Sequence, residues 1–170
     1  MPSEAQIREE IGPAVRTLQI IVVAIAFGLL TFLGVAVYMS ATGQFRPPND
    51  EPREMLTWLS LACAGMAVVM HLVIPSMMVS TARRGMLEQS MQARGGKASE
   101  VISWFAVYQV RTIMAVAILE GAGFFLSIAH LMEGRPESAG AAVVILALIL
   151  TRLPTAPRVA EWIETQMRHA

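Results

Sequence analysis

The chain is organised around apolar runs that are longer than the buried helices of an ordinary soluble domain. Three of them cover residues 18–39, 55–79 and 112–132, and a shorter fourth covers 138–153. A helix needs about 20 residues to cross the ~30 Å hydrocarbon layer of a bilayer, so the first three runs are long enough. The fourth needs a locally thinner bilayer or flanking polar residues such as Glu137. The pattern predicts an all-α integral membrane protein with four transmembrane helices.

Composition agrees with this fold class and excludes several partners. The 170 residues are 55% hydrophobic and 15% charged, whereas soluble domains average about 25% charged residues. The formal net charge is zero and no basic, aromatic-rich surface is evident, so nucleic acid is not an expected partner. We expect the lipid bilayer as the main partner, together with a second copy of the chain or another membrane protein.

The basic residues are distributed unevenly between the two predicted sides of the membrane. One side, with both termini and the middle loop, holds most of the 13 basic residues: Arg8, Arg16, Arg83, Arg84, Arg94, Lys97, Arg111, Arg152, Arg158 and Arg168. The other side holds Arg46, Arg53 and Arg135. The positive-inside rule therefore predicts that both termini are cytoplasmic. Because arginine is preferred to lysine, we expect a bacterial protein, located in the cytoplasmic (inner) membrane as a multi-pass protein.

The segments outside the apolar runs are short, so we expect a single membrane domain over residues 1–170. The loop 40–54 is rich in proline, and a helix break is predicted at Gly95–Gly96. Ser138 is the predicted N-cap of the fourth helix. Residues 157–169 place their apolar side chains on one face, which is typical of an amphipathic helix at the membrane surface. Docking to a partner protein is the alternative for that helix.

An internal repeat is suggested by the first and third apolar runs. When the sequence is shifted by 93 residues, Ile20–Met39 aligns with Ile113–Met132 without a gap, and nine of the twenty positions are identical. We therefore predict two helical hairpins in parallel orientation that derive from one ancestor. Repeat-built bundles often carry a functional site near the membrane midplane, at the repeat interface. In this alignment Phe27 occupies the position of Glu120.

Glu120 is the strongest candidate for a functional residue, because it is a carboxylate in the middle of the third run. A charged side chain at the bilayer centre costs at least about 2.5 kcal/mol, and such residues usually face a partner, a cavity or an ion path. We expect Glu120 to rest protonated and to exchange protons or bind a cation. The alternative is a neutral, hydrogen-bonded side chain that fixes the register of two helices.

His71 is the predicted partner of Glu120, because helical rise places the two residues within about 3 Å of the same depth. The alternative for His71 is a hydrogen bond to a backbone carbonyl. Small residues at four-residue spacing predict close helix packing. These candidates are Ala24, Gly28, Ala117, Gly121, Gly123 and Ser127.

Two short segments resemble parts of known families. The segment Ala117–Gly121 resembles the carboxylate-bearing helix of the proteolipid c subunit of rotary ATP synthases, which implies binding of a proton or Na⁺ at Glu120. The chain lacks the glycine-repeat partner helix of that family. Met66 and Met70, near Cys63, resemble the Met-xxx-Met element of eukaryotic-type copper transporters. Methionine is also an ordinary packing residue, and the chain has no methionine-rich capture segment.

The sequence contains none of the common catalytic or phosphate-binding motifs. No cluster of His, Cys and carboxylate residues has the spacing of metal ligands, and no cofactor is expected. The leading hypothesis is a polytopic inner-membrane protein without enzymatic activity, which serves as a structural or accessory subunit of a membrane assembly. The alternative is a small proton- or cation-linked transporter or channel subunit that uses Glu120.

Overall fold

Five helices make up the described part of the computed structural model, which covers residues 4–43, 54–92 and 97–168. None of these residues forms a strand. The helices are α1 (Glu4–Ala41), α2 (Met55–Gln92), α3 (Lys97–Glu133), α4 (Pro136–Thr151) and α5 (Ala156–Arg168). The predicted proline-rich turn in the first loop and the predicted break at Gly95–Gly96 lie outside the described residues.

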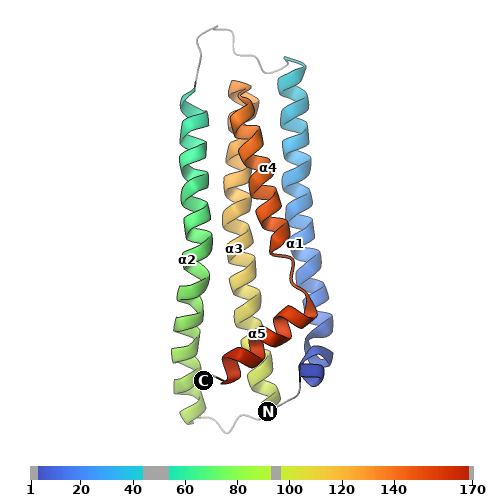
Figure 1. Cartoon of the computed structure of the whole chain (residues 1–170), viewed down its shortest axis with the longest axis vertical. Helices are drawn as coiled ribbons and strands as arrows, with labels where there is room; N and C mark the ends of the chain where they lie inside the picture. The colour runs from blue at the N-terminus through green and yellow to red at the C-terminus, as the bar shows by residue number, and fades with distance from the viewer. Residues whose placement is uncertain (1–3, 44–53, 93–96, 169–170) are drawn as a thin grey trace.

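The long helices α1, α2 and α3 run side by side, and α4 packs against them as a shorter fourth member (Figure 1). α3 contacts each of α1, α2 and α4, whereas α1 and α2 do not contact each other within the described residues. Of the two predicted hairpins, α3–α4 is a packed pair and α1–α2 is not. The two halves therefore pack differently, and the repeat stays a prediction from the sequence.

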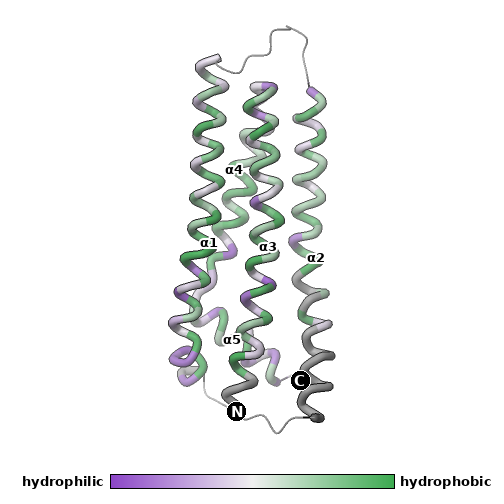
Figure 2. The backbone as a smooth tube through the Cα atoms, turned by 180° about the vertical axis from the view of Figure 1, so that it is seen from behind, coloured by the Kyte–Doolittle hydropathy of each residue, from purple (hydrophilic) through white to green (hydrophobic). Residues whose placement is uncertain are grey.

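Three helical segments are long and apolar enough to cross a membrane: Gln6–Ala41, Met55–Thr81 and Val101–Glu133. α4 and α5 are long and apolar enough only when taken together, and they would form a fourth span broken by a 68° bend. α4 alone has 16 residues, which corresponds to about 24 Å at 1.5 Å per residue. Hydrophobic residues follow most of the length of α1 to α4, and hydrophilic residues gather on α5 and at the neighbouring end of α1 (Figure 2).

The interior divides into two hydrophobic cores. The first, which we call the bundle core, lies among α1, α2, α3 and α4 and consists of aliphatic residues: Val22, Ala26, Leu29, Leu33, Ala64, Ala67, Val116, Leu119, Ala122, Leu126, Ala142, Ile145 and Ile149. Gly123 allows the closest approach in this core, since a Cβ atom there would lie 2.5 Å from Leu29 Cδ2 and 3.3 Å from Ile145 Cγ2.

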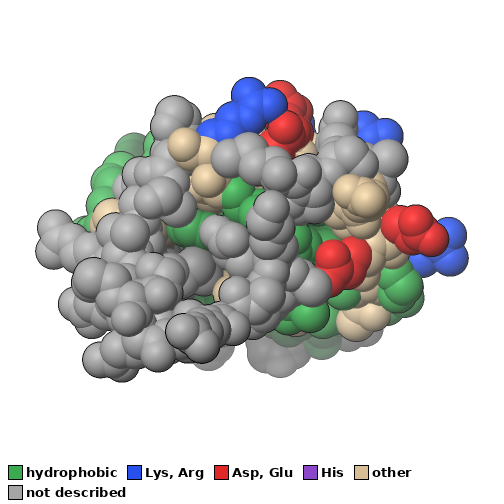
Figure 3. Space-filling view, turned by 90° about the horizontal axis from the view of Figure 1, so that it is seen from below, with side chains coloured by type: hydrophobic (Ala, Val, Ile, Leu, Met, Phe, Trp, Pro, Cys, Tyr) green, Lys and Arg blue, Asp and Glu red, His purple; other side chains and the backbone are tan. Residues whose placement is uncertain are grey.

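The second core, the terminal core, lies where α5 crosses the ends of α1 and α3. It contains Ile7, Ile11, Val15, Leu18, Val101, Trp104, Phe105, Tyr108, Val159, Ala160 and Ile163. α5 crosses the bundle near both chain termini (Figure 1), so we call this the terminal end of the molecule. Seen from that end, the described acidic and basic side chains lie toward the rim (Figure 3).

α5 was predicted to turn its apolar face toward the membrane surface, and the structure shows a different arrangement. The side chains of Val159 and Ile163 are completely buried, and they pack in the terminal core against α1 and α3. These residues therefore pack inside the protein, and the location of α5 at the membrane surface stays a prediction. A sequence pattern gives the amphipathic face of a helix but does not say which surface covers it.

The opposite end of the bundle is fastened by polar contacts between α2 and the α3–α4 turn. The Glu133 carboxylate accepts hydrogen bonds of 2.8 Å from the backbone N–H groups of both Leu56 and Thr57. It thereby satisfies two donors that the first turn of α2 leaves free. Arg135 forms a 2.7 Å ion pair with Glu54.

The N-cap prediction for the fourth helix is wrong. α4 begins at Pro136, two residues before Ser138, and its N-cap is Arg135, which makes no side-chain capping bond. The Ser138 hydroxyl instead donates to the carbonyl oxygen of Arg135 at 2.8 Å. Proline is favourable in the first turn of a helix because it needs no hydrogen-bond acceptor there, so the helix can start earlier than the serine.

Candidate functional site: an arginine pocket between the two cores

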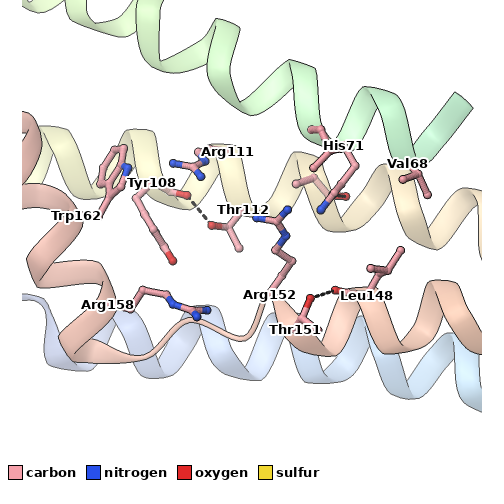
Figure 4. Close-up of a pocket in the computed structure, with 12 residues that line it drawn as sticks. Val68, His71, Tyr108, Arg111, Thr112, Leu148, Thr151, Arg152, Arg158 and Trp162 are labelled. Carbon is pink, nitrogen blue, oxygen red and sulfur yellow. Dashed lines mark hydrogen bonds between the residues drawn. The ribbon is translucent and has the colours of Figure 1, made fainter.

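A cavity of about 490 Å³ lies between the bundle core and the terminal core, where α2, α3, α4 and α5 meet. We call it the arginine pocket. Its polar and aromatic lining residues are His71, Tyr108, Arg111, Thr112, Thr151, Arg152, Arg158 and Trp162. Figure 4 shows that Arg152 extends from the α4–α5 connection toward α3, on which Tyr108, Arg111 and Thr112 lie, and that Arg158 of α5 runs alongside that connection.

The position of two arginines depends on the bend between α4 and α5. α4 ends at Thr151, with Arg152 as its C-cap, and Pro154 follows in the connection, where proline commonly stops a helix. The Gln19 side chain of α1 donates a 2.6 Å hydrogen bond to the carbonyl oxygen of Pro154. This bond holds the corner against α1, and the 68° bend then brings Arg158 to the pocket from the first turns of α5.

The pocket has an unbalanced charge. Three guanidinium groups line it, and no Asp or Glu is among the residues that do so. Within the described part of the chain, Arg111, Arg152 and Arg158 form no ion pair with a carboxylate; the ion pairs there belong to Arg135 and Arg168. Like charges that share a partly buried space repel one another. An anion would relieve this repulsion, and guanidinium groups bind phosphate and carboxylate with paired hydrogen bonds.

Aromatic rings stabilise one wall of the pocket. The Arg111 guanidinium carbon lies 5.6 Å from the centre of the Trp162 ring, within the range of a cation–π interaction. Trp162 also makes edge-to-face contacts with Tyr108 and Trp104, with ring centres 5.3 and 6.1 Å apart. The pocket and the terminal core therefore share side chains, and the orientation of Arg111 depends on the docking of α5.

His71 lies in this pocket and does not pair with Glu120. Its Nδ1 atom is 3.1 Å from the carbonyl oxygen of Ala115 on α3, and the side chain is buried. This is the second of the two arrangements that the sequence allowed. Figure 4 shows the Arg152 side chain directed toward Thr112 and His71, so the structure groups His71 with the arginines.

Glu120 lies apart from the arginine pocket, because it is not among the lining residues. Its side chain is partly exposed. No hydrogen bond or ion pair joins it to another residue in the described ranges 4–43, 54–92 and 97–168. Its helical neighbours Ala117 and Gly121 are exposed, and a Cβ atom added to Gly121 would meet nothing within 4 Å. Phe27, its counterpart in the repeat alignment, is 67% exposed.

The other predicted packing residues fall into two groups. Gly123 and Ser127 are buried where α1, α3 and α4 meet, and the Ser127 hydroxyl donates to the Gly123 carbonyl at 2.8 Å. Ala24 and Gly28 are exposed like Ala117 and Gly121, and they do not lie at a contact within one copy of the chain. Their role in packing stays a prediction that requires a second copy.

The described residues contain no group of three or more His, Cys, Asp or Glu side chains that could hold a metal ion. Cys63 is exposed, and Met66 and Met70 are 64% and 45% exposed on the surface of α2. These three residues therefore do not surround an interior site in this chain.

The arginine pocket is not evident from the sequence, in which its arginines indicate only the orientation of the chain. Arg111 lies on α3, Arg152 is the C-cap of α4 and Arg158 lies on α5, and nothing in their spacing indicates that they meet. One signal was available. Arg111 and Arg152 lie at the same edge of consecutive antiparallel helices, which should place them at one depth.

Comparisons of the chain with protein-family models, with curated proteins and with solved structures gave no match.

Proposed function

We propose that this chain is a non-enzymatic, multi-pass protein of the bacterial inner membrane that binds an anionic group in the arginine pocket. In this proposal it acts as a structural or accessory component of a membrane assembly, with both termini in the cytoplasm. The distribution of basic residues supports that orientation. The terminal end, including α5, would then face the cytoplasm, and the arginine pocket would lie at the cytoplasmic boundary of the membrane.

One observation supports anion binding above all: three arginines line one cavity without a lining carboxylate. Arginine is suited to this role because its guanidinium group is always charged and its planar donor fork matches phosphate and carboxylate oxygens. Arg111 and Arg152 are partly buried and Arg158 is exposed. Positive charges gathered where water is partly excluded cost free energy unless a negative group accompanies them. The chemistry of the expected ligand is therefore an oxyanion, with phosphate as the best match.

Anion binding can be tested by thermal unfolding of the purified chain in a non-ionic detergent. Inorganic phosphate is added while chloride holds the ionic strength constant. A ligand that binds only the folded state raises the Tm as its concentration rises. We expect a rise for the wild type, and a much smaller rise for Arg152→Gln and Arg158→Gln.

Arg168→Gln is the matched control, because Arg168 lies on α5 outside the pocket and pairs with Glu164 at 2.6 Å. It should keep the response of the wild type to phosphate. The proposal is overturned if neither phosphate nor a phosphate-bearing lipid raises the wild-type Tm. It is equally overturned if Arg168→Gln loses as much of the response as the pocket variants do.

A proton- or cation-linked transporter that uses Glu120 is the second candidate function. The supporting observation is that the Glu120 carboxylate, midway along α3, has no hydrogen-bond partner among the described residues. Intramembrane carboxylates commonly belong to ion or proton pathways. In liposomes, Glu120→Gln should abolish a pH-dependent flux without lowering protein abundance. If Glu120→Gln changes only thermal stability or oligomer size, this candidate is rejected.

A further inference from the structure

The depth of the arginine pocket along the helices narrows the choice of anion; this step rests on the proposed membrane location and function. Arg111 precedes Glu133, the last residue of α3, by 22 positions, or about 33 Å of helix. His71 follows Met55, the first residue of α2, by 16 positions, or about 24 Å. A hydrocarbon layer of about 30 Å that begins at the level of Glu133 and Met55 therefore ends at the level of the pocket. Lipid phosphates begin at that level.

The lining of the pocket changes character from one side to the other. The three arginines share the polar part of the lining with His71, Thr112 and Thr151, and the apolar part includes Leu72 of α2 and Leu148 of α4. Leu72 is 62% exposed, so the apolar part of the lining continues onto the outer surface of α2. A soluble phosphate ion would gain nothing from this apolar part, whereas an acyl chain would bury apolar surface against it.

We propose that the arginine pocket binds the phosphate headgroup of an anionic phospholipid, whose acyl chains pack on the apolar lining at Leu72 and Leu148 and on the adjoining surface of α2. Arg152 and Arg158 would supply paired hydrogen bonds to the phosphate oxygens. Arg111, held against the Trp162 ring at 5.6 Å, would supply a third positive charge. The inner leaflet is the appropriate source because anionic lipids are enriched at the cytoplasmic surface.

Such a lipid would also join elements that otherwise share few contacts. Within the described residues α5 contacts α1 and α3, but it does not contact α2 or α4. The arginine pocket is nevertheless lined by residues of α2, α3, α4 and α5. A bound headgroup would therefore connect α5 to the two helices it does not touch, and it should raise the stability of the folded chain.

The first experiment compares lipid and free phosphate on the full chain in non-ionic detergent. Dioleoyl phosphatidylglycerol, dioleoyl phosphatidylcholine, glycerol 3-phosphate and inorganic phosphate are titrated separately, and the apparent Kd is taken from the shift in Tm. We expect phosphatidylglycerol to bind most tightly. Arg152→Gln should weaken it by about tenfold, the usual effect of losing one charge-assisted hydrogen bond, and Arg168→Gln should not change it.

The second experiment separates the headgroup from the acyl chains. Leu72→Trp enlarges a side chain that is 62% exposed, and Leu59→Trp makes the same change at a 46% exposed position of α2 outside the pocket. Leu72→Trp should obstruct the proposed path of the acyl chains and weaken phosphatidylglycerol binding. Binding of inorganic phosphate should be unchanged, and Leu59→Trp should behave as the wild type.

The outcomes distinguish this inference from the proposed function. If glycerol 3-phosphate and inorganic phosphate bind as tightly as phosphatidylglycerol, or if Leu72→Trp and Leu59→Trp do not differ, the pocket binds a soluble anion and the lipid inference is overturned alone. If phosphatidylcholine binds as tightly as phosphatidylglycerol and Arg152→Gln has no effect, lipid binding does not depend on the negative charge of the headgroup. The inference also fails in that case. If no phosphate compound binds, the lipid inference and anion binding are both overturned.

Discussion

The bundle core and the terminal core are built from different residues and have different surroundings. The bundle core contains Ala, Val, Leu and Ile, whereas the terminal core also contains Trp104, Phe105 and Tyr108. Around the bundle core many large hydrophobic side chains point outward; Ile20, Met66 and Val144 are each more than half exposed. Around the terminal core, α5 turns charged residues to the outside.

This difference indicates that separate forces hold the two regions together. In the terminal core, packing removes apolar surface from water, so the hydrophobic effect stabilises the contact. If the bundle spans a bilayer, as proposed, its outside is in an environment as apolar as its inside, and its helices would associate through close van der Waals packing of small residues. The bundle helices leave much of their apolar length uncovered. In the most apolar 18-residue stretch of α2 only 13% is buried inside the protein, compared with 50% in that of α3.

The largest effect is expected for Trp104→Ala in the terminal core. Trp104 is 1% exposed, and its ring packs edge-to-face on Trp162. Removing a buried tryptophan side chain costs about 3–5 kcal/mol, and this loss should release α5 while the bundle core remains folded. Limited proteolysis of the detergent-solubilised protein should then cut the C-terminal segment first.

Trp58→Ala provides the control, because Trp58 is 65% exposed on α2. It should leave the proteolysis pattern unchanged. If Trp104→Ala unfolds both cores in a single transition, the two regions are one cooperative unit and the comparison is wrong.

The next effect is expected for Gly123→Val in the bundle core. The added side chain would collide with Leu29 and Ile145, since even a Cβ atom would lie 2.5 Å from Leu29 Cδ2. Overpacking of this kind costs about 1–3 kcal/mol. Gly121→Val is matched on the same helix, and no atom lies within 4 Å of its new Cβ. Thermal unfolding should show that Gly123→Val lowers the stability of the protein and that Gly121→Val does not. An equal loss of stability in both variants would indicate that a second copy packs on Gly121.

The apolar runs predicted the helices well because a segment of 20 apolar residues has few alternatives to a helix. The predicted spans 18–39, 55–79 and 112–132 lie inside α1, α2 and α3. The helical residues that extend α1, α2 and α3 beyond those spans were less predictable. The chain continues as helix for many polar or mixed residues, and α1 starts at Glu4 rather than near Leu18.

The candidate site was harder to predict than the helices. His71 and Glu120 lie at similar depths, but depth does not fix the rotation of a helix, and the two residues are not paired in the structure. The contact between Arg111 and Trp162 depends on the bend before α5, which no periodic pattern encodes. Gln19 was visible as a polar residue in an apolar run, but its acceptor, the Pro154 carbonyl, is 135 positions away in the chain.

A smaller effect is expected for Gln19→Leu at the junction of the two cores. The substitution removes the 2.6 Å hydrogen bond to the Pro154 carbonyl, which should cost about 1 kcal/mol of unfolding free energy. Because that bond holds the α4–α5 corner, the response of the Tm to phosphate should fall as well. Thr17→Val is the control, since the Thr17 hydroxyl bonds only to Pro13 within its own helix. If Gln19→Leu keeps the full response, the corner is held by other contacts.

The smallest effect is expected at the surface of α5, where Arg168 pairs with Glu164 at 2.6 Å. The Arg168 side chain is 63% exposed, so water and salt screen the interaction. Exposed pairs four residues apart on a helix stabilise it by about 0.3–0.5 kcal/mol, and Arg168→Gln should lower the unfolding free energy by no more than that. The difference from the wild type should vanish in high salt, because the Debye length falls to about 3 Å at 1 M. A loss above about 1 kcal/mol that persists in high salt would mean that α5 is held by its polar face as well as by the terminal core.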